Sequence, residues 1–156
     1  MRPKYETQAD RDNEDRAIPL IESVFHGVAR KLPDNHFADF CVVDANVKVS
    51  AFVEFKKRSF RWGDYPTVML SVSKFHKLVS TREVKIRSFF VVEDSLGELK
   101  AVNLHRADLE YRVEYGGRTA KTRDSRDVEP VVHISAEQFR TIGHVKQRGA
   151  STEEDG

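Results

Sequence analysis

The chain has little of several features that would assign it to a common class of protein. Among its 156 residues is a single cysteine, Cys41, which excludes an internal disulfide and indicates a reducing compartment such as a cytoplasm. No apolar run approaches the roughly 20 residues needed to span a bilayer, and the charged N-terminus does not resemble a secretory signal. A Gly-rich phosphate-binding loop and internal repeats are missing as well. We therefore do not expect a membrane, secreted or repeat protein.

A surplus of charge of one sign is also lacking, since 26 lysines and arginines face 25 acids. The balance is uneven along the chain, because the stretch from residue 56 to residue 87 holds nine basic residues and two acids. A protein that holds a polyanion beside a carboxylate site needs such a stretch, since its acids repel phosphate. Solvated helix and strand faces would explain the same pattern. The nine basic residues are Lys56, Lys57, Arg58, Arg61, Lys74, Lys77, Arg82, Lys85 and Arg87.

The composition, with 39% hydrophobic and 33% charged residues, is typical of one globular domain. A chain of 156 residues is long enough to bury a substantial core. We expect this domain to cover residues 1–145. Residues 146–156, which end in an acidic run, are expected to form a disordered tail.

The stretch from His36 to Arg58 predicts two strands joined by a tight turn. Both strands, at residues 37–43 and 47–55, are rich in Val, Phe and Ala. We expect Ala45-Asn46 to form a two-residue loop, because Asn tolerates positive φ. This loop pairs Asp39 with Phe52.

Side chains alternate along a strand, so this pairing places Asp39, Glu54 and Lys56 on one face. The other face is wholly apolar. As diagonal neighbours, Asp39 and Glu54 would have Cα atoms about 7 to 8 Å apart, a separation that one divalent cation can bridge. Asp44 falls on the opposite face, although a one-residue change in the loop would select Asp44 instead of Asp39.

An acid on one strand and Glu-x-Lys on the next resemble the signature of the PD-(D/E)xK nuclease superfamily. Here the motif would be Asp39 followed by Glu54-Phe55-Lys56, with Ala38 in place of the proline that usually precedes the acid. The resemblance implies an α/β (α+β) fold of the restriction-endonuclease-like type, with a mixed central sheet flanked by helices and, here, a C-terminal β-rich extension. It also implies hydrolysis of phosphodiester bonds with the help of Mg²⁺ or Mn²⁺.

The resemblance assigns a role to each residue of the motif. Asp39, Glu54 and the Phe55 carbonyl would hold the cation through oxygen ligands. Lys56 would orient the attacking water or offset the charge that develops on the phosphate.

Some superfamily members have a glutamate on the helix before the acid strand, and Glu14 would be its counterpart. Apolar spacing predicts a helix from Thr7 to Arg30, interrupted at Pro19 by a kink or by a second helix that begins near Ala17. In a continuous helix Glu14 lies on the apolar stripe and could complete the metal site. If the chain kinks, Glu14 is a solvated charge.

The remaining elements follow from local patterns, and none indicates a strand between the first helix and Asp39. Beyond the hairpin, Ser73 should cap the second helix, and the run up to residue 93 suits a strand buried on both faces. Residues 99–104 and 109–115 look like a hairpin or meander. The expected elements are strands at 67–71, 84–93, 99–104, 109–115 and 131–134, and helices at 74–80 and 135–142, with a polar loop at 116–129.

The candidate nucleic-acid contacts belong to the basic stretch and to the loop around Trp62. An aromatic residue between arginines suits stacking on a distorted base, although a tryptophan is more often packed within its own domain. The second helix presents lysines that could reach a phosphate or form a solvated face. The candidate contacts are Lys57, Arg58, Arg61, Trp62, Lys74 and Lys77.

Two functional hypotheses follow from the resemblance. In the first, the protein is a metal-dependent nuclease acting on DNA, with RNA not distinguished, as a junction resolvase or a phage recombination and repair nuclease. Such enzymes usually act as homodimers, and a phage-encoded one would work in the host cytoplasm. In the second, it is a non-catalytic nucleic-acid-binding or assembly protein with a decayed site. Metal-dependent cleavage separates the two.

Overall fold

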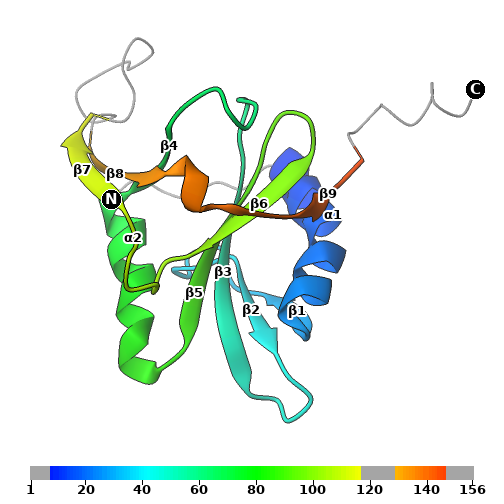
Figure 1. Ribbon diagram of the computed structural model, residues 1–156. Coiled ribbons are helices and arrows are strands. Elements are labelled where there is room, and N and C mark those ends of the chain that lie inside the picture. Colours follow the sequence, from blue (N-terminus) through cyan, green and yellow to red (C-terminus); the bar gives the residue numbers. More distant parts are fainter. Residues whose placement is uncertain (1–7, 117–128, 147–156) are drawn as a thin grey trace, which may run out of the picture.

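The computed structural model describes residues 8–116 and 129–146, which form two sheets and two α-helices (Figure 1). The larger sheet has six strands in the order β1-β2-β3-β5-β6-β9, and the smaller has three in the order β4-β8-β7. No helix in these ranges is long and apolar enough to cross a membrane. The elements are α1 (Gln8–Phe25), β1 (Val28–Lys31), β2 (Phe40–Val43), β3 (Val49–Lys57), β4 (Thr67–Ser71), α2 (Val72–Val79), η1 (Ser80–Val84), β5 (Arg87–Glu93), β6 (Glu98–Asn103), β7 (Tyr111–Tyr115), β8 (Pro130–Ser135), η3 (Ala136–Gln138) and β9 (Arg140–His144).

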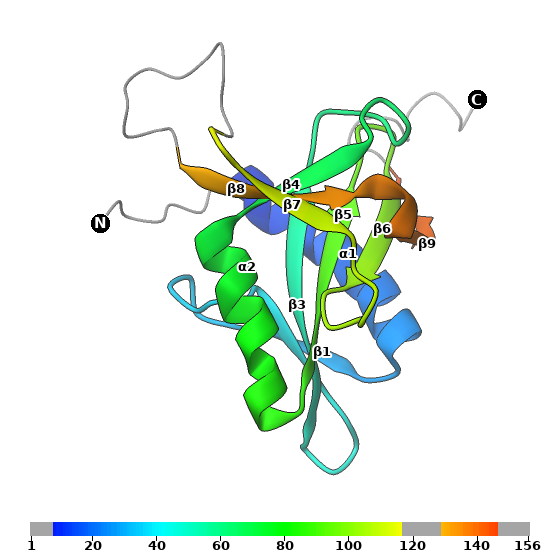
Figure 2. The ribbon, with the colours of Figure 1, turned by 60° about the vertical axis from the view of Figure 1, so that its left-hand side comes forward.

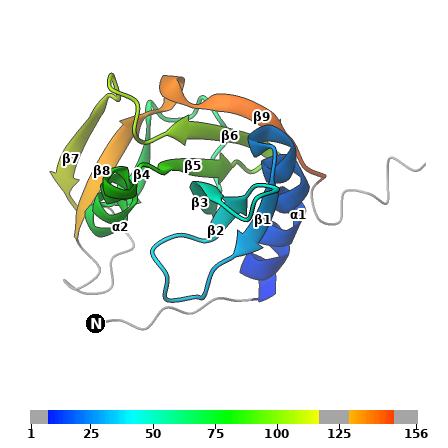
Figure 3. The ribbon, with the colours of Figure 1, turned by 90° about the horizontal axis from the view of Figure 1, so that it is seen from below.

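The six-stranded sheet lies between two apolar clusters. Helix α1 covers one face, whereas α2 and the small sheet lie over the other (Figure 3). Strand β5 faces both clusters, with Val91 toward α1 and with Phe90 and Val92 toward α2. Its burial on both faces was predicted from its continuous apolar run. The parallel pairing of β3 with β5, reached through β4 and α2, makes the large sheet mixed (Figure 2).

Helix α1 is continuous from Gln8 to Phe25, so of the two alternatives at Pro19, a kink or a second helix that begins near Ala17, the second helix is wrong. Pro19 lies within it, and the buried side chains of Ala17 and Ile21 face the sheet. The helix ends before Arg30 because His26 adopts a positive φ of 57° and the chain reverses.

Strand β1 follows this reversal and was missed in the sequence. Gly27 allows the close approach to β2, because a Cβ there would lie 2.7 Å from Val42 Cγ1 and 2.8 Å from the Val43 carbonyl oxygen. Val28 had suggested a further helical turn, but it begins β1 and pairs with Val43.

The turn between β2 and β3 is longer than the predicted loop at Ala45-Asn46. The Asp44 carboxylate accepts hydrogen bonds from the N–H groups of Asn46 at 2.8 Å and Lys48 at 3.0 Å. Positive φ occurs at Val47 instead of Asn46, with a value of 63°. A side-chain cap of this kind competes with a two-residue loop and lengthens the turn.

The longer turn moves the pairing of the two strands by two residues. Phe40 pairs with Val53 and Cys41 with Phe52, after an irregularity at Val43. The predicted pairing of Asp39 with Phe52 is therefore wrong. One further step along the observed register brings Asp39 opposite Glu54.

The second half of the chain departs from the predictions at element ends. Helix α2 begins at Val72 and is capped by Ser71, whose hydroxyl accepts from the Lys74 N–H at 3.1 Å, so Ser73 is not the cap. Strand β5 begins at Arg87, because η1 occupies Ser80–Val84.

The predicted hairpin of residues 99–104 with 109–115 is wrong, since β6 and β7 belong to different sheets. The predicted helix at 135–142 is also wrong, because the short η3 turn leads directly into β9. Most of the expected polar loop, at residues 117–128, and the tail beyond Lys146 lie outside the described residues.

Candidate active site at the end of strand β3

Glu54 is buried near the end of β3, on the side of the sheet that α2 covers. Its side chain has no exposed surface, and two lysines reach its carboxylate. Lys56 Nζ lies 3.6 Å from Oε2, and Lys74 Nζ lies 3.5 Å from Oε1. A buried carboxylate requires such cationic partners, because burial without them carries a large desolvation cost.

Asp39 lies just before β2 and is fixed by its own backbone. Its N–H donates to the Val53 carbonyl at 3.1 Å, and its carbonyl accepts from the Leu32 N–H at 2.8 Å. Its carboxylate oxygen Oδ2 accepts from the Phe55 N–H at 2.8 Å. The acid on β2 is thereby tied to the peptide that joins Glu54 and Phe55.

Glu14 reaches the same region from α1. It is 8% exposed, and Lys31 Nζ of β1 lies 3.0 Å from its Oε1. The solvated charge that we considered as an alternative for Glu14 is therefore wrong. Lys31 was not singled out in the sequence, because β1 was not recognised and its partner lies on a distant helix.

Asp39 and Glu14 line one open cleft with a volume of about 420 Å³. The cleft lies between the first half of α1, the β1–β2 connection and the end of β3. Its lining balances four basic against four acidic residues, so a phosphate group would not meet a uniformly positive surface. The charged lining residues are Lys31, Lys56, Lys57, Arg58, Asp10, Glu14, Asp34 and Asp39.

The donor types around Glu54 fit a hard divalent cation. Two carboxylates, Asp39 and Glu54, adjoin the main chain at Phe55, and hard cations prefer oxygen ligands. Across the described ranges, no three Asp, Glu, His or Cys side chains converge as a metal-binding group. The fit therefore rests on two carboxylates and a backbone carbonyl, with Glu14 across the cleft.

Of the six predicted nucleic-acid contacts, Lys57 and Arg58 line the cleft, while Arg61 and Lys77 are exposed elsewhere. Arg58 donates to the Met69 carbonyl at 3.1 Å. Burial lowers the pKa of the Arg58 guanidinium, and the charge of Glu54 opposes that effect. Lys74 points inward to Glu54 and also donates to the Phe37 carbonyl at 3.1 Å, so its side chain contacts the site's acid.

Trp62 packs within its own domain. Its ring lies 5.3 Å from those of Phe60 and Phe139, and its Nε1 donates to the Glu98 carbonyl at 3.0 Å. The ammonium of Lys100 lies 5.1 Å from the ring centroid. These contacts favour the packing alternative over base stacking.

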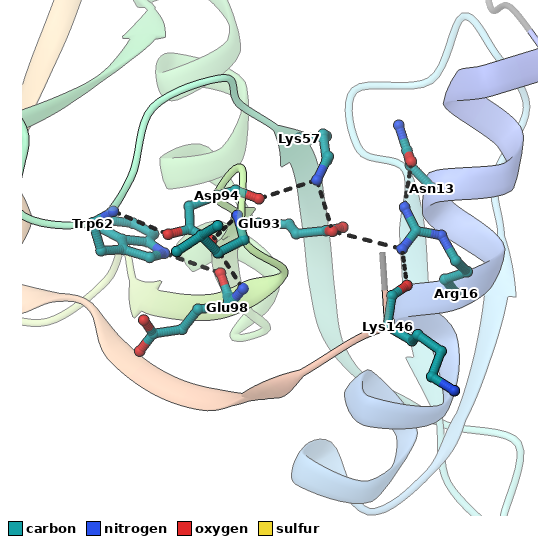
Figure 4. Close-up of polar contacts among 9 residues, drawn as sticks. Asn13, Arg16, Lys57, Trp62, Glu93, Asp94, Glu98 and Lys146 are labelled. Carbon is teal, nitrogen blue, oxygen red and sulfur yellow. Dashed lines mark hydrogen bonds and ion pairs between the residues drawn. The ribbon is translucent and has the colours of Figure 1, made fainter. Parts of the chain in front are cut away.

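A second buried carboxylate, Glu93, joins Lys57 to helix α1 (Figure 4). Lys57 Nζ lies 3.0 Å and Arg16 Nη1 3.7 Å from Glu93 Oε2. Lys57 also donates to the Asp94 carbonyl at 3.0 Å. We call Glu93, Lys57 and Arg16 the Glu93 network. It fixes α1, which carries Glu14, against the ends of β3 and β5.

Cys41 is buried on β2 and is not a candidate nucleophile. Burial raises the pKa of its thiol, and its backbone hydrogen bond and the charge of Arg30 only partly oppose this. A raised pKa disfavours the reactive thiolate. Cys41 is therefore a small core residue.

Comparison with known proteins gives a family and similar solved structures. A family model described as "Phage putative PDDEXK endonuclease" matches residues 1–142. Among solved structures, the chain is similar to Hjc, a Holliday junction resolvase from the archaeal hyperthermophile Archaeoglobus fulgidus, with a TM-score of 0.52 and 15% sequence identity. That similarity covers 85% of this chain and 88% of Hjc. No curated protein matches.

The similarity to Hjc bears on the fold. It agrees with the restriction-endonuclease-like architecture predicted from the motif, a mixed central sheet with helices on its faces. The extra β-structure that we expected beyond the core is present as β6 to β9, which contribute to both sheets.

Proposed function

The chain belongs to the family of phage PDDEXK endonucleases, and on that premise we propose that it hydrolyses phosphodiester bonds in DNA with the help of a divalent cation. The observation that carries the proposal is the hydrogen bond from the Phe55 N–H to Asp39, which holds the acid of β2 beside Glu54. Lys56 contacts Glu54 and lines the same cleft as Asp39. We propose the host cytoplasm as the place of action.

Asp39, Glu54 and the Phe55 carbonyl would hold the cation, Mg²⁺ or Mn²⁺, with Glu14 as a further acid. A cation of this kind supplies Lewis-acid polarisation of the scissile phosphate and lowers the pKa of an attacking water. The four basic residues in the lining of the cleft support binding of a phosphate, because the acids alone would repel it.

Lys56 is the group that we assign to the developing negative charge. Its side chain is 38% exposed, so it can reach a substrate, while its ammonium remains 3.6 Å from Glu54. The Lys56 ammonium, held in this position, would orient the attacking water or stabilise the pentavalent phosphate. Lys57 and Arg58 would contact neighbouring phosphates at the cleft.

A second candidate is a non-catalytic nucleic-acid-binding protein with the same fold. It is favoured by the lysine contacts to Glu14 and Glu54, and by the lack of a converging three-ligand group in the described residues. Such a protein would bind DNA through the same cleft and leave it intact.

Cleavage of a panel of nucleic acids tests the proposal. We would compare supercoiled plasmid, linear duplex, single strands, a four-way junction and RNA, with Mg²⁺, with Mn²⁺ and with chelator. Glu54→Gln and Lys56→Ala should each reduce cleavage roughly 100-fold or more, as expected for loss of a charge used in the transition state. Glu83→Gln and Lys48→Ala change exposed side chains outside the cleft and should cleave like the wild type.

Each outcome decides between the candidates. Metal-dependent cleavage that both site variants abolish supports the nuclease, and the preferred substrate then defines its specificity. Binding of DNA without cleavage under any metal contradicts the nuclease and supports the binding protein. Cleavage that Glu54→Gln leaves unchanged would place the activity elsewhere.

A further inference from the structure

Strand β7 is an outer strand of the small sheet and carries an exposed apolar stripe. Figure 3 shows it at the margin of the molecule, on the side away from α1. Tyr111, Val113 and Tyr115 are 50%, 57% and 74% exposed. They share the face of the buried Val132 and Ile134 on β8, because Val113 pairs with Val132 and Tyr111 with Ile134. The core-facing side of the sheet thus extends beyond its cover.

Within the described residues, helix α2 covers the beginning of this stripe. The ring of Phe75 on α2 lies 5.0 Å from that of Tyr111. Val113 and Tyr115, farther along β7, are the more exposed pair. An apolar stripe of this kind on a short strand is typical of a surface that another protein covers.

The backbone of β7 offers its hydrogen bonds at the same edge. Ser135 N–H donates to the Glu110 carbonyl at 3.1 Å, and Gly116 N–H donates to the Glu129 carbonyl at 2.9 Å. These bonds show that the even-numbered residues of β7 direct their backbone N–H and C=O groups toward β8. In an antiparallel ladder the alternate residues, Tyr111, Val113 and Tyr115, therefore turn their N–H and C=O groups outward. Within the described ranges, no further strand pairs with β7.

Two other edge strands, β4 and β1, are protected. The Arg58 guanidinium donates to the Met69 carbonyl and so caps a backbone group at the edge of β4. Strand β1 carries exposed Arg30 and Lys31. Unbalanced charges and capped backbone groups discourage strand pairing. Strand β7 also carries charges, Arg112 and Glu114, but these have opposite signs and form an ion pair with each other, and the strand has no lysine or proline.

We propose that β7 pairs antiparallel with β7 of a second copy of this chain, across a two-fold axis at Val113. This register sets Arg112 opposite Glu114 of the partner subunit, and Tyr111 opposite Tyr115 of the partner subunit. Opposite charges and aromatic pairs directly across an antiparallel ladder are stabilising. A shift by two residues in either direction would instead set Arg112 against Arg112, or Glu114 against Glu114. Within one chain Arg112 already donates to Glu114 of the same strand, and Glu114 also contacts His133. The two-fold register alternates the charges of two such ion pairs across the axis, so charge complementarity favours a second copy in this register.

The pairing joins the small sheets of two copies into one continuous sheet and leaves the cleft beside Asp39 open. It also goes beyond the proposed nuclease activity and does not depend on it. Loss of cleavage in a site variant and loss of dimer in a β7 variant are thus separate results.

Sedimentation equilibrium of the full-length protein over a range of concentrations tests this interface. Reversal of one charge, by Arg112→Glu or Glu114→Arg, sets like charges against each other twice across the axis and should raise the dimer dissociation constant roughly tenfold or more. The double variant with both reversals should recover most of the wild-type dissociation constant. Arg140→Glu on β9 is the matched control, since it reverses an exposed charge at another edge.

Val113→Pro gives an independent test, because it removes an outward-facing N–H while keeping the bonds to β8. It should weaken the dimer while circular dichroism shows a folded chain. A wild type that stays monomeric at all concentrations overturns the proposal. A dimer that neither the proline nor the single reversals affect would overturn it too, and failure of the double reversal to restore the dimer would refute the register.

Discussion

The Glu93 network should contribute measurably to stability, and Glu93→Gln removes its charge while keeping its shape. Glu93 has no exposed surface, and Lys57 Nζ lies 3.0 Å from its carboxylate. Removal of one member of a fully buried ion pair costs about 3 to 5 kcal/mol. The side chains of Lys57 and Arg16 are 25% and 26% exposed, so water offsets part of that cost. We expect a loss of about 2 to 3 kcal/mol in the free energy of unfolding.

Urea unfolding followed by circular dichroism measures this loss, with an unchanged m value as evidence that the compactness of the two states is unaltered. For a chain of this size the melting temperature should fall by roughly 4 to 12 °C. A double-mutant cycle with Lys57→Met isolates the pair itself and should give an interaction energy of about 1 to 2 kcal/mol. Glu83→Gln, a change of the same chemistry at an exposed site, is the control.

Two results would refute this reasoning. If Glu93→Gln unfolds within about 0.5 kcal/mol of the wild type, as an exposed substitution does, the network is not a stabilising device. If the double-mutant cycle gives no interaction energy, the loss does not come from the contact between Glu93 and Lys57.

Three further predictions follow from local geometry. Lys74→Met should lower the DNA cleavage rate roughly tenfold without weakening DNA affinity, because the Lys74 side chain faces Glu54 and is mostly buried. Weakened DNA binding at an unchanged cleavage rate would contradict this. Burial alone would raise the pKa of the Asp94 carboxyl. Hydrogen bonds from the backbone N–H groups of Trp62, Leu96 and Glu98, together with the charge of Lys57, outweigh burial, so the pKa lies below its ordinary value. The stability that the Asp94 charge contributes is therefore fully present above the unfolded-state pKa of about 3.9 and is lost as the pH falls through the folded-state pKa. In urea unfolding, Asp94→Asn should be destabilising at pH 7 and less destabilising near pH 3. An equal loss of stability at both pH values would contradict this. Val47→Asn should stabilise the chain by about 0.5 to 1 kcal/mol in urea unfolding, since Val47 is 82% exposed and has a φ of 63°, and a destabilised variant would contradict the strain argument.

The parts of the fold that follow from local pattern were predicted well. The buried run around Phe90 and the strand at Thr67 were found because apolar residues concentrate there. Strand β1 was missed because four residues with the sequence VARK carry no strand signal, and because the apolar spacing of the preceding helix continued to Arg30. The C-terminal helix was wrong because a capping-box pattern at Ser135 formed only a single 3-10 turn before tertiary pairing with β6 drew the chain into β9.

The candidate site could be predicted in its residue types but not in its geometry. Glu54 and Lys56 are two positions apart on one strand, so their contact followed from the Glu-x-Lys spacing. The register of Asp39 was wrong by two residues, because the carboxylate of Asp44 lengthens the turn in a way that residue preferences do not encode. Contacts that join distant segments, such as Lys31 with Glu14 and Lys74 with Glu54, required the structure.

Asp39, whose carboxylate accepts from the Phe55 N–H, is assigned to hydrolysis through its negative charge. The most direct test is the single-turnover rate of DNA cleavage against Mg²⁺ concentration for the wild type, Asp39→Asn and Asp44→Asn. Asparagine keeps an oxygen that can accept from the Phe55 N–H, so Asp39→Asn removes the charge and preserves the local backbone. We predict that the wild type and Asp44→Asn cleave at similar rates and that Asp39→Asn loses roughly 100-fold or more. Equal rates for the wild type and Asp39→Asn, with both proteins folded, would contradict the assignment of this site.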